Sequence, residues 1–114
     1  MEPVKLIDII GSKTAVSPRA GLKAYDYAAD RVSKGQAFII SFDNVEDLTS
    51  AFCNSFIGKL YMNFEPQAVA SLMQISGLDE AHVWYKKIKN AILLGTNENA
   101  RTLHKTNLED IILS

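Results

Sequence analysis

Few residues in this chain have the types and spacing that catalysis or metal binding requires. The histidines His82 and His104 are far apart and match none of the paired-histidine motifs of metal sites. Cys53 is the only cysteine, which excludes an internal disulfide and a cysteine-based zinc site. We expect His82 to lie on the surface and Cys53 to be a buried small apolar side chain rather than a nucleophile. The sequence therefore predicts a protein that is not an enzyme and that uses no metal and no cofactor.

The adjacent hydroxyl residues Thr49 and Ser50 are the most informative pair. They precede a segment with helical apolar periodicity, so one of them should cap the start of a helix. A phosphate at such a position would lie beside unpaired backbone N–H groups and the positive end of the helix dipole. Thr49 and Ser50 are therefore candidate phosphoacceptors, and a helix cap with no further role is the simpler interpretation.

A polar connection follows the most apolar segment of the chain, where functional loops of parallel sheets gather. Its acidic residues favour a partner or cation site, and a solvated turn is the simpler interpretation. Together with polar residues of the following helix they form a candidate partner-binding face. Its members are Asp43, Asn44, Glu46, Asp47, Asn54, Ser55 and Lys59. A separate candidate site for an anion combines Ser12, Lys13 and Arg19 near the expected start of an earlier helix.

The elements that position these residues are expected to alternate between strands and helices. Strands are expected over 4–10, 37–42 and 69–75, and helices from Pro18 to about residue 34, over 50–63, and from about 81 to a stop at Gly95. The segment 37–42 is apolar throughout, which favours a strand buried on both faces. Strands joined by single helices require right-handed crossovers and a mostly parallel sheet. We therefore predict a small α/β fold over 1–95, with alternating helices that cover the sheet.

Residues 96–114 form a C-terminal tail for which the sequence allows two structures. A short helix over 108–113 is one expectation and a strand over 110–113 is the other. The apolar residues of the tail are candidates for docking on the domain or on a second copy of the chain, so a homo-oligomer stays open.

Composition excludes several classes of protein. The chain has 114 residues, of which 47% are apolar and 22% charged, as in one ordinary globular domain. The net charge of −1 argues against binding of nucleic acid by a basic surface. No apolar run approaches the ~20 residues of a membrane helix, and no signal peptide is apparent. We expect a soluble cytoplasmic protein with no membrane and no nucleic-acid partner.

Three segments, 39–45, 48–52 and 56–60, resemble the central motif of STAS-like domains, most closely the compact STAS-like domains of unknown function. Residues 11–13 and 17–21 also look like the opening motif of that group. In order and spacing, the resemblance covers about residues 5–94 of the chain. It implies a small STAS-like α/β fold and a binding module.

STAS domains are the fold of anti-sigma factor antagonists. In those antagonists, a serine at the start of the helix after a central strand is phosphorylated by an anti-sigma factor with a histidine-kinase-type ATPase fold. Ser50 matches this serine by position. The family's Asp-Ser-Ser-Gly is Thr49-Ser50-Ala51-Phe52 here, so the preceding Asp and the Gly that would allow close approach by a kinase are absent.

The resemblance implies a regulatory protein–protein interaction module with a histidine-kinase-like ATPase as the leading partner class. The alternative is a domain that binds a small molecule or nucleotide at the C-terminal edge of the sheet.

Overall fold

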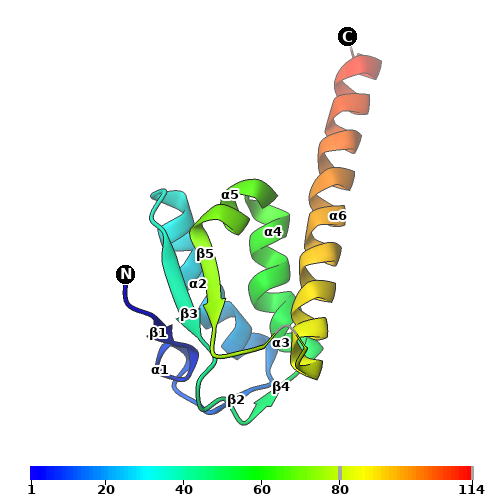
Figure 1. Cartoon of the computed structure of the whole chain (residues 1–114). Helices are drawn as coiled ribbons and strands as arrows, with labels where there is room; N and C mark the ends of the chain where they lie inside the picture. The colour runs from blue at the N-terminus through cyan, green and yellow to red at the C-terminus, as the bar shows by residue number, and fades with distance from the viewer. Residues whose placement is uncertain (80, 114) are drawn as a thin grey trace.

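Two small sheets, both parallel throughout, form the framework of the chain (Figure 1). The computed structural model describes residues 1–79 and 81–113, with side chains up to residue 100. The larger sheet has the order β1-β3-β5, with strands Val4–Lys5, Phe38–Ser41 and Met73–Ser76. In the smaller sheet, β2 (Thr14–Ala15) pairs with β4 (Asp47–Leu48). The predicted α/β class and parallel strands are confirmed.

Helices occupy most of the remaining chain. They are α1 Leu6–Ile10, α2 Pro18–Ser33, α3 Ser50–Cys53, the π-helix η1 Asn54–Gly58, α4 Lys59–Asn63, α5 Pro66–Leu72 and α6 Val83–Leu113. The segments α3, η1 and α4 follow one another without a break, and we call residues 50–63 the central helix. The predicted helix over 50–63 is confirmed, and the π-helical turn within it was not expected. None of the helices, over the described residues, is long and apolar enough to cross a membrane.

The core lies between the larger sheet and the helices behind it in Figure 1. Tyr27 of α2 meets Phe38 of β3 edge-to-face, with ring centroids 6.3 Å apart. Phe38 and Ile40 are buried on the helical side, whereas Ile39 is half-buried on the opposite side. The expectation that this strand is buried on both faces is confirmed at Ser41, which is buried on the same face as Ile39, and holds only in part at Ile39.

Two predicted strands are partly helical. Only Val4–Lys5 of 4–10 is a strand, and Leu6–Ile10 forms a helical turn that ends at Gly11 with φ 71°. Leu6 and Ile10 are both buried, which the helical spacing of four residues allows as readily as strand alternation. Likewise Pro66 begins helix α5, because proline fits the first helical position. The strand predicted at 69–75 therefore begins only at Met73 and ends one residue later than expected, at Ser76.

Helix α6 passes through Gly95 and continues to Leu113, so the predicted stop at Gly95 is wrong. A Cβ atom at position 95 would overlap the carbonyl oxygen of Gly58, which shows that Gly95 serves a close helix contact. The alternative strand over 110–113 is wrong too, because this segment is the end of α6. Docking of the tail concerns side chains beyond residue 100, outside the described residues.

A second close contact joins α2 to the central helix. A Cβ atom at Gly21 would lie 2.7 Å from Cβ of Ser55 and 2.8 Å from the carbonyl oxygen of Phe52. The central helix is thus held between α2 and α6 by backbone contacts that leave no space for a side chain at Gly21 or Gly95.

Candidate functional site

Thr49 is the residue that caps the central helix. Its hydroxyl accepts a hydrogen bond from the Phe52 N–H at 3.2 Å and donates one to the Val16 carbonyl at 2.7 Å. The prediction that one residue of the pair caps this helix is confirmed. Ser50 is the first helical residue and is exposed, and its hydroxyl has no hydrogen-bond partner among the described residues. Of the two candidate phosphoacceptors, Ser50 therefore has the free hydroxyl.

The start of α2 lies next to the start of the central helix. The pairing of β2 with β4 brings them together, and the Thr49 N–H donates to the Ala15 carbonyl at 3.1 Å. Ser17 caps α2, since its hydroxyl accepts from the Ala20 N–H at 3.0 Å. Two helix N-termini therefore meet on this side of the protein, and both dipoles favour negative charge there.

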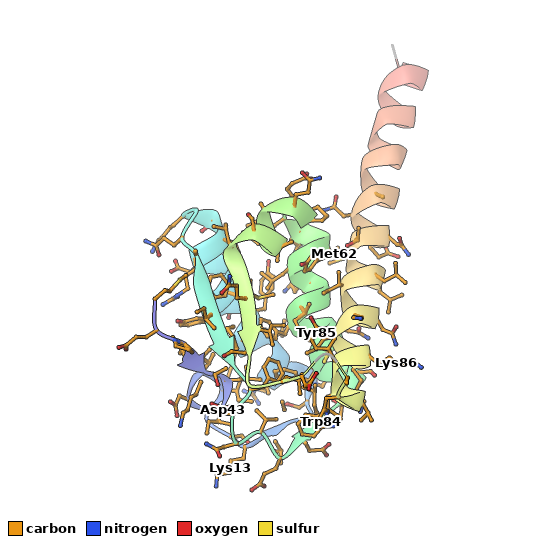
Figure 2. The ribbon with its side chains drawn as sticks, in the orientation of Figure 1. Lys13, Asp43, Met62, Trp84, Tyr85 and Lys86 are labelled. Atoms are coloured by element: carbon orange, nitrogen blue, oxygen red, sulfur yellow. The ribbon has the colours of Figure 1, made fainter. Side chains whose placement is uncertain are left out.

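The acidic connection after β3 makes mostly local hydrogen bonds. The Ser41 hydroxyl accepts from the Asp43 N–H at 3.1 Å, and the Asp47 carboxylate accepts from the Leu48 N–H at 2.8 Å. Asn44 has a left-handed backbone with φ 67°. The side chains of Asp43, Asn44, Glu46 and Asp47 are exposed, and Figure 2 shows Asp43 at the same end of the molecule as Lys13. The hydrogen bonds at Asp43 and Asp47 are those of a turn.

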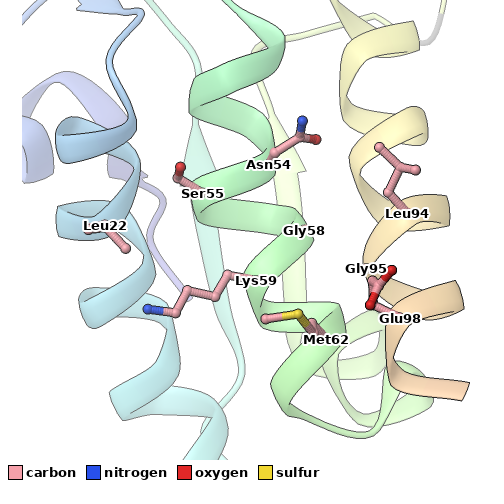
Figure 3. Close-up of a pocket in the computed structure, with 9 residues that line it drawn as sticks. All are labelled: Leu22, Asn54, Ser55, Gly58, Lys59, Met62, Leu94, Gly95 and Glu98. Atoms are coloured by element: carbon pink, nitrogen blue, oxygen red, sulfur yellow. The ribbon is translucent and has the colours of Figure 1, made fainter. Parts of the chain in front are cut away.

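A groove of about 370 Å³ runs along the central helix between α2 and α6 (Figure 3). Its lining residues are Leu22 of α2, Asn54, Ser55, Gly58, Lys59 and Met62 of the central helix, and Leu94, Gly95 and Glu98 of α6. The side chains of Leu22, Met62 and Leu94 are 42%, 41% and 55% exposed. The structure thus places three predicted partner residues, Asn54, Ser55 and Lys59, beside apolar side chains that were absent from the prediction.

The residues of the connection after β3, Asp43, Asn44, Glu46 and Asp47, do not line this groove. The predicted partner face is therefore divided between the groove and the loop. Lys59 lies at the groove edge with its ammonium 4.4 Å from the centre of the Tyr25 ring. A cation–π contact of this kind keeps the Lys59 side chain over α2.

A second cavity, of about 240 Å³, lies at the start of α2 and includes two of the predicted anion-binding residues. Ser12 and Arg19 line it, together with Lys23, which is absent from the predicted set. Arg19 and Lys23 are four residues apart on one helix, and this spacing was a signal that both cations share a face. Lys13 does not line the cavity, and its carbonyl accepts from the Glu46 N–H at 2.8 Å.

A family model matches residues 25–83, more than half of the chain, and describes a STAS-like domain of unknown function. The chain belongs to this family. The matched segment of this STAS-like domain contains β3, the acidic connection, Thr49, Ser50 and the central helix. Most of α6 and the opening segments 11–13 and 17–21 lie outside it. Searches among curated proteins and among solved structures found no match.

Cys53 of this STAS-like domain is fully buried in the first turn of the central helix, as predicted. Burial raises the pKa of its thiol to about 11, and the nearby Lys87 ammonium offsets part of that rise. A thiol with this pKa is protonated at neutral pH and is a poor nucleophile. His82 is exposed, as predicted, and its Nδ1 accepts from the Trp84 N–H at 3.1 Å.

Proposed function

We propose that this STAS-like domain is a regulatory protein-interaction module whose partner binding is switched by phosphorylation of Ser50. The proposal depends on one observation, the exposed hydroxyl of Ser50 at the first position of the central helix. Ser50 is one helical turn from Asn54, since its carbonyl accepts from the Asn54 N–H. A phosphate on Ser50 would therefore lie next to the groove that Asn54 helps to line.

The groove has the character of a protein-binding surface. Its exposed apolar side chains, Leu22, Met62 and Leu94, are bordered by the polar residues Asn54 and Lys59. Apolar contacts surrounded by polar groups are typical of interfaces that form and dissociate. By the family resemblance, the partner we propose is an ATPase of the histidine-kinase type.

The proposed modification is an ordinary phosphoryl transfer. The Ser50 oxygen attacks the γ-phosphorus of an ATP molecule held by the partner kinase, and the bond to ADP breaks as the Oγ–P bond forms. The hydroxyl proton passes to a base on the kinase. The product adds about −1.5 to −2 charges beside the groove, which changes what can dock there.

A binding experiment with three forms of the protein tests this proposal. Immobilised wild-type protein, Ser50→Ala and Ser50→Glu are incubated with lysate of the source organism, and retained ATPases are identified by mass spectrometry. We expect one histidine-kinase-type ATPase to bind wild type and Ser50→Ala and to be lost with Ser50→Glu. That ATPase, purified, should transfer labelled phosphate from ATP to wild type but not to Ser50→Ala. Equal recovery by wild type and Ser50→Glu contradicts the switch, and recovery of no ATPase contradicts the partner class.

A second function, binding of a small phosphorylated molecule such as a nucleotide, is favoured by the cavity at the start of α2. Arg19 and Lys23 line this cavity together with the hydroxyl residues Ser12 and Ser17. Thermal unfolding with millimolar ATP or GTP tests it, because a ligand of the native state raises the unfolding temperature. A rise that disappears in the double variant of Arg19→Gln and Lys23→Gln supports this function, and no rise contradicts it.

A further inference from the structure

Lys87 connects α6 to the chain just before Ser50. Its half-buried side chain reaches across from α6, and its ammonium donates a hydrogen bond of 2.8 Å to the Leu48 carbonyl. No carboxylate among the described side chains, 1–79 and 81–100, lies within ion-pair distance of Lys87. The partner of this cation is thus the neutral carbonyl of the last residue of β4.

The ammonium of Lys87 lies close to the first turn of the central helix. Its charge acts on the buried thiol of Cys53, where it lowers the pKa against the larger effect of burial. Ser50 is three residues before Cys53 and therefore on a neighbouring part of the same helix surface. Ser50 also follows Leu48 by two residues, a span of at most about 7 Å. These relationships place the Lys87 ammonium beside the segment from Leu48 to Cys53, which carries Ser50.

The electrostatic setting favours such a pair. The first turn of the central helix presents the positive end of its dipole, so a second positive charge beside it is unfavourable. An anion at Ser50 would interact favourably with both the helix end and the ammonium of Lys87. The wild-type protein without phosphate has no acidic residue in the first turn of this helix.

We propose that Lys87 is the positioning residue that binds a phosphate on Ser50 and in doing so leaves the Leu48 carbonyl. This inference rests on the proposed function, because it names the residue of this chain that binds the phosphate on Ser50. Lys87 and Leu94 are seven residues apart, about two turns of the same helix. Loss of the hydrogen bond between Lys87 and the Leu48 carbonyl would therefore change how the first turns of α6 are held, and would shift Leu94 and Gly95, which line the groove.

A double-mutant cycle on the isolated protein tests the pair. Ser50→Glu is compared with its neutral isostere Ser50→Gln, each in the wild-type background and with Lys87→Met, by urea unfolding at low salt. We expect the change from Gln to Glu to raise the folding equilibrium constant about threefold more when Lys87 is present. This excess should shrink in 1 M NaCl, where the Debye length is only about 3 Å.

Lys86→Met is the matched control, because Lys86 is an exposed neighbour on α6 whose side chain extends away from the domain (Figure 2). It removes the same charge and should leave the threefold excess unchanged. The proposal is overturned if the change from Gln to Glu at position 50 has the same effect on the folding equilibrium constant with and without Lys87. It is also overturned if Lys86→Met reduces that effect as much as Lys87→Met does. The cycle uses no kinase and no partner, so its failure leaves the binding experiment on the proposed function unaffected.

A second measurement covers the case in which Lys87→Met does not fold. Phosphoserine is installed at position 50 in the wild-type chain and in Lys87→Gln, a variant that keeps a hydrogen-bond donor for the Leu48 carbonyl, and its titration is followed by phosphorus NMR. Both proteins have the same helix end and only the first has the ammonium, so we expect the second pKa of the phosphate to be lower in the wild-type chain by about half a unit or more. Equal pKa values in the two proteins overturn the assignment of Lys87.

Discussion

Gly95 of α6 packs its backbone against the carbonyl oxygen of Gly58, with no space for a side chain between the two helices. Gly21 makes the corresponding contact on the other side of the central helix. The helices α2 and α6 therefore stay close to the central helix along the groove, and backbone forms part of the groove floor. This arrangement has direct consequences for stability.

We expect Gly95→Ala to lower the free energy of unfolding by about 1–3 kcal/mol, because the added methyl group must displace the Gly58 backbone. Alanine favours a helix by about 1 kcal/mol over glycine, so the direction of the change separates crowding from helix propensity. Urea denaturation measures the effect. Asn90→Ala, at an exposed position of the same helix, is the control and should change stability by about 0.5 kcal/mol or less. A Gly95→Ala protein as stable as wild type would show that the contact does not limit packing.

Thr49 and Ser50 should differ sharply when each is replaced by alanine. Thr49→Ala removes the helix cap and the hydrogen bond to the Val16 carbonyl, so we expect a loss of about 1–2 kcal/mol. Ser50→Ala removes only an exposed hydroxyl and should change stability by about 0.5 kcal/mol or less. Thermal and urea unfolding of both variants tests this. Similar losses for the two variants would mean that Ser50 also supports the fold.

Leu94 and Leu93 provide a matched pair for the groove. Both are exposed, at 55% and 59%, but only Leu94 lines the groove. We expect Leu94→Glu to weaken binding of the partner at least about tenfold, because a carboxylate would lose its water on docking against an apolar surface. Leu93→Glu should bind like wild type. Calorimetry with the partner recovered in the binding experiment measures both, and equal affinities would exclude the groove as the binding surface.

Stability should fall in alkaline solution because of Cys53. The thiol has an ordinary pKa of 9.0, and burial raises it to about 11 in the folded protein. Between these values the unfolded chain has already lost the proton that the folded chain keeps, so the free energy of unfolding decreases as pH rises from about 9 to 11. Burial also raises the pKa of Tyr61 and adds a loss of the same sign.

Urea unfolding at pH 8 and pH 10 measures this dependence. The variant Cys53→Ala lacks the thiol. Its free energy of unfolding should therefore decrease by about 1 kcal/mol less than that of wild type between the two pH values. An identical pH dependence of wild type and Cys53→Ala would mean that the thiol is not perturbed. Wild-type Cys53 should also react slowly with alkylating reagents at pH 8, because little thiolate is present.

Features that depend on local chemistry are predictable from this sequence. Ser17-Pro18 and Thr49-Ser50 specify helix starts, because a capping hydroxyl and a proline at the first position act on their own neighbours. The apolar run around Ile40 specifies the central strand of the sheet. Short apolar runs such as 4–10 and 69–75 are ambiguous, because the same residues satisfy a helical turn and a strand.

The groove itself could not be predicted, since its walls come from distant parts of the chain. Ser55 and Lys59 are recognisable as the polar side of a helix, but Leu22 and Leu94 reach them only through the tertiary fold. The role of Gly95 also depends on a residue far away in the sequence. Glycine often ends helices, and only the position of Gly58 shows that this one permits a close approach instead.

The groove is lined in part by glycine backbone and in part by exposed apolar side chains, and this has a consequence for how such a domain diversifies. Backbone at Gly58 and Gly95 lines the groove, whereas its apolar contacts are offered by Leu22, Met62 and Leu94, which are not part of the buried core. Exchange of those three side chains would redirect the scaffold to another target without repacking its interior. Protein design or natural divergence within the family can therefore change which partner binds while the fold stays the same.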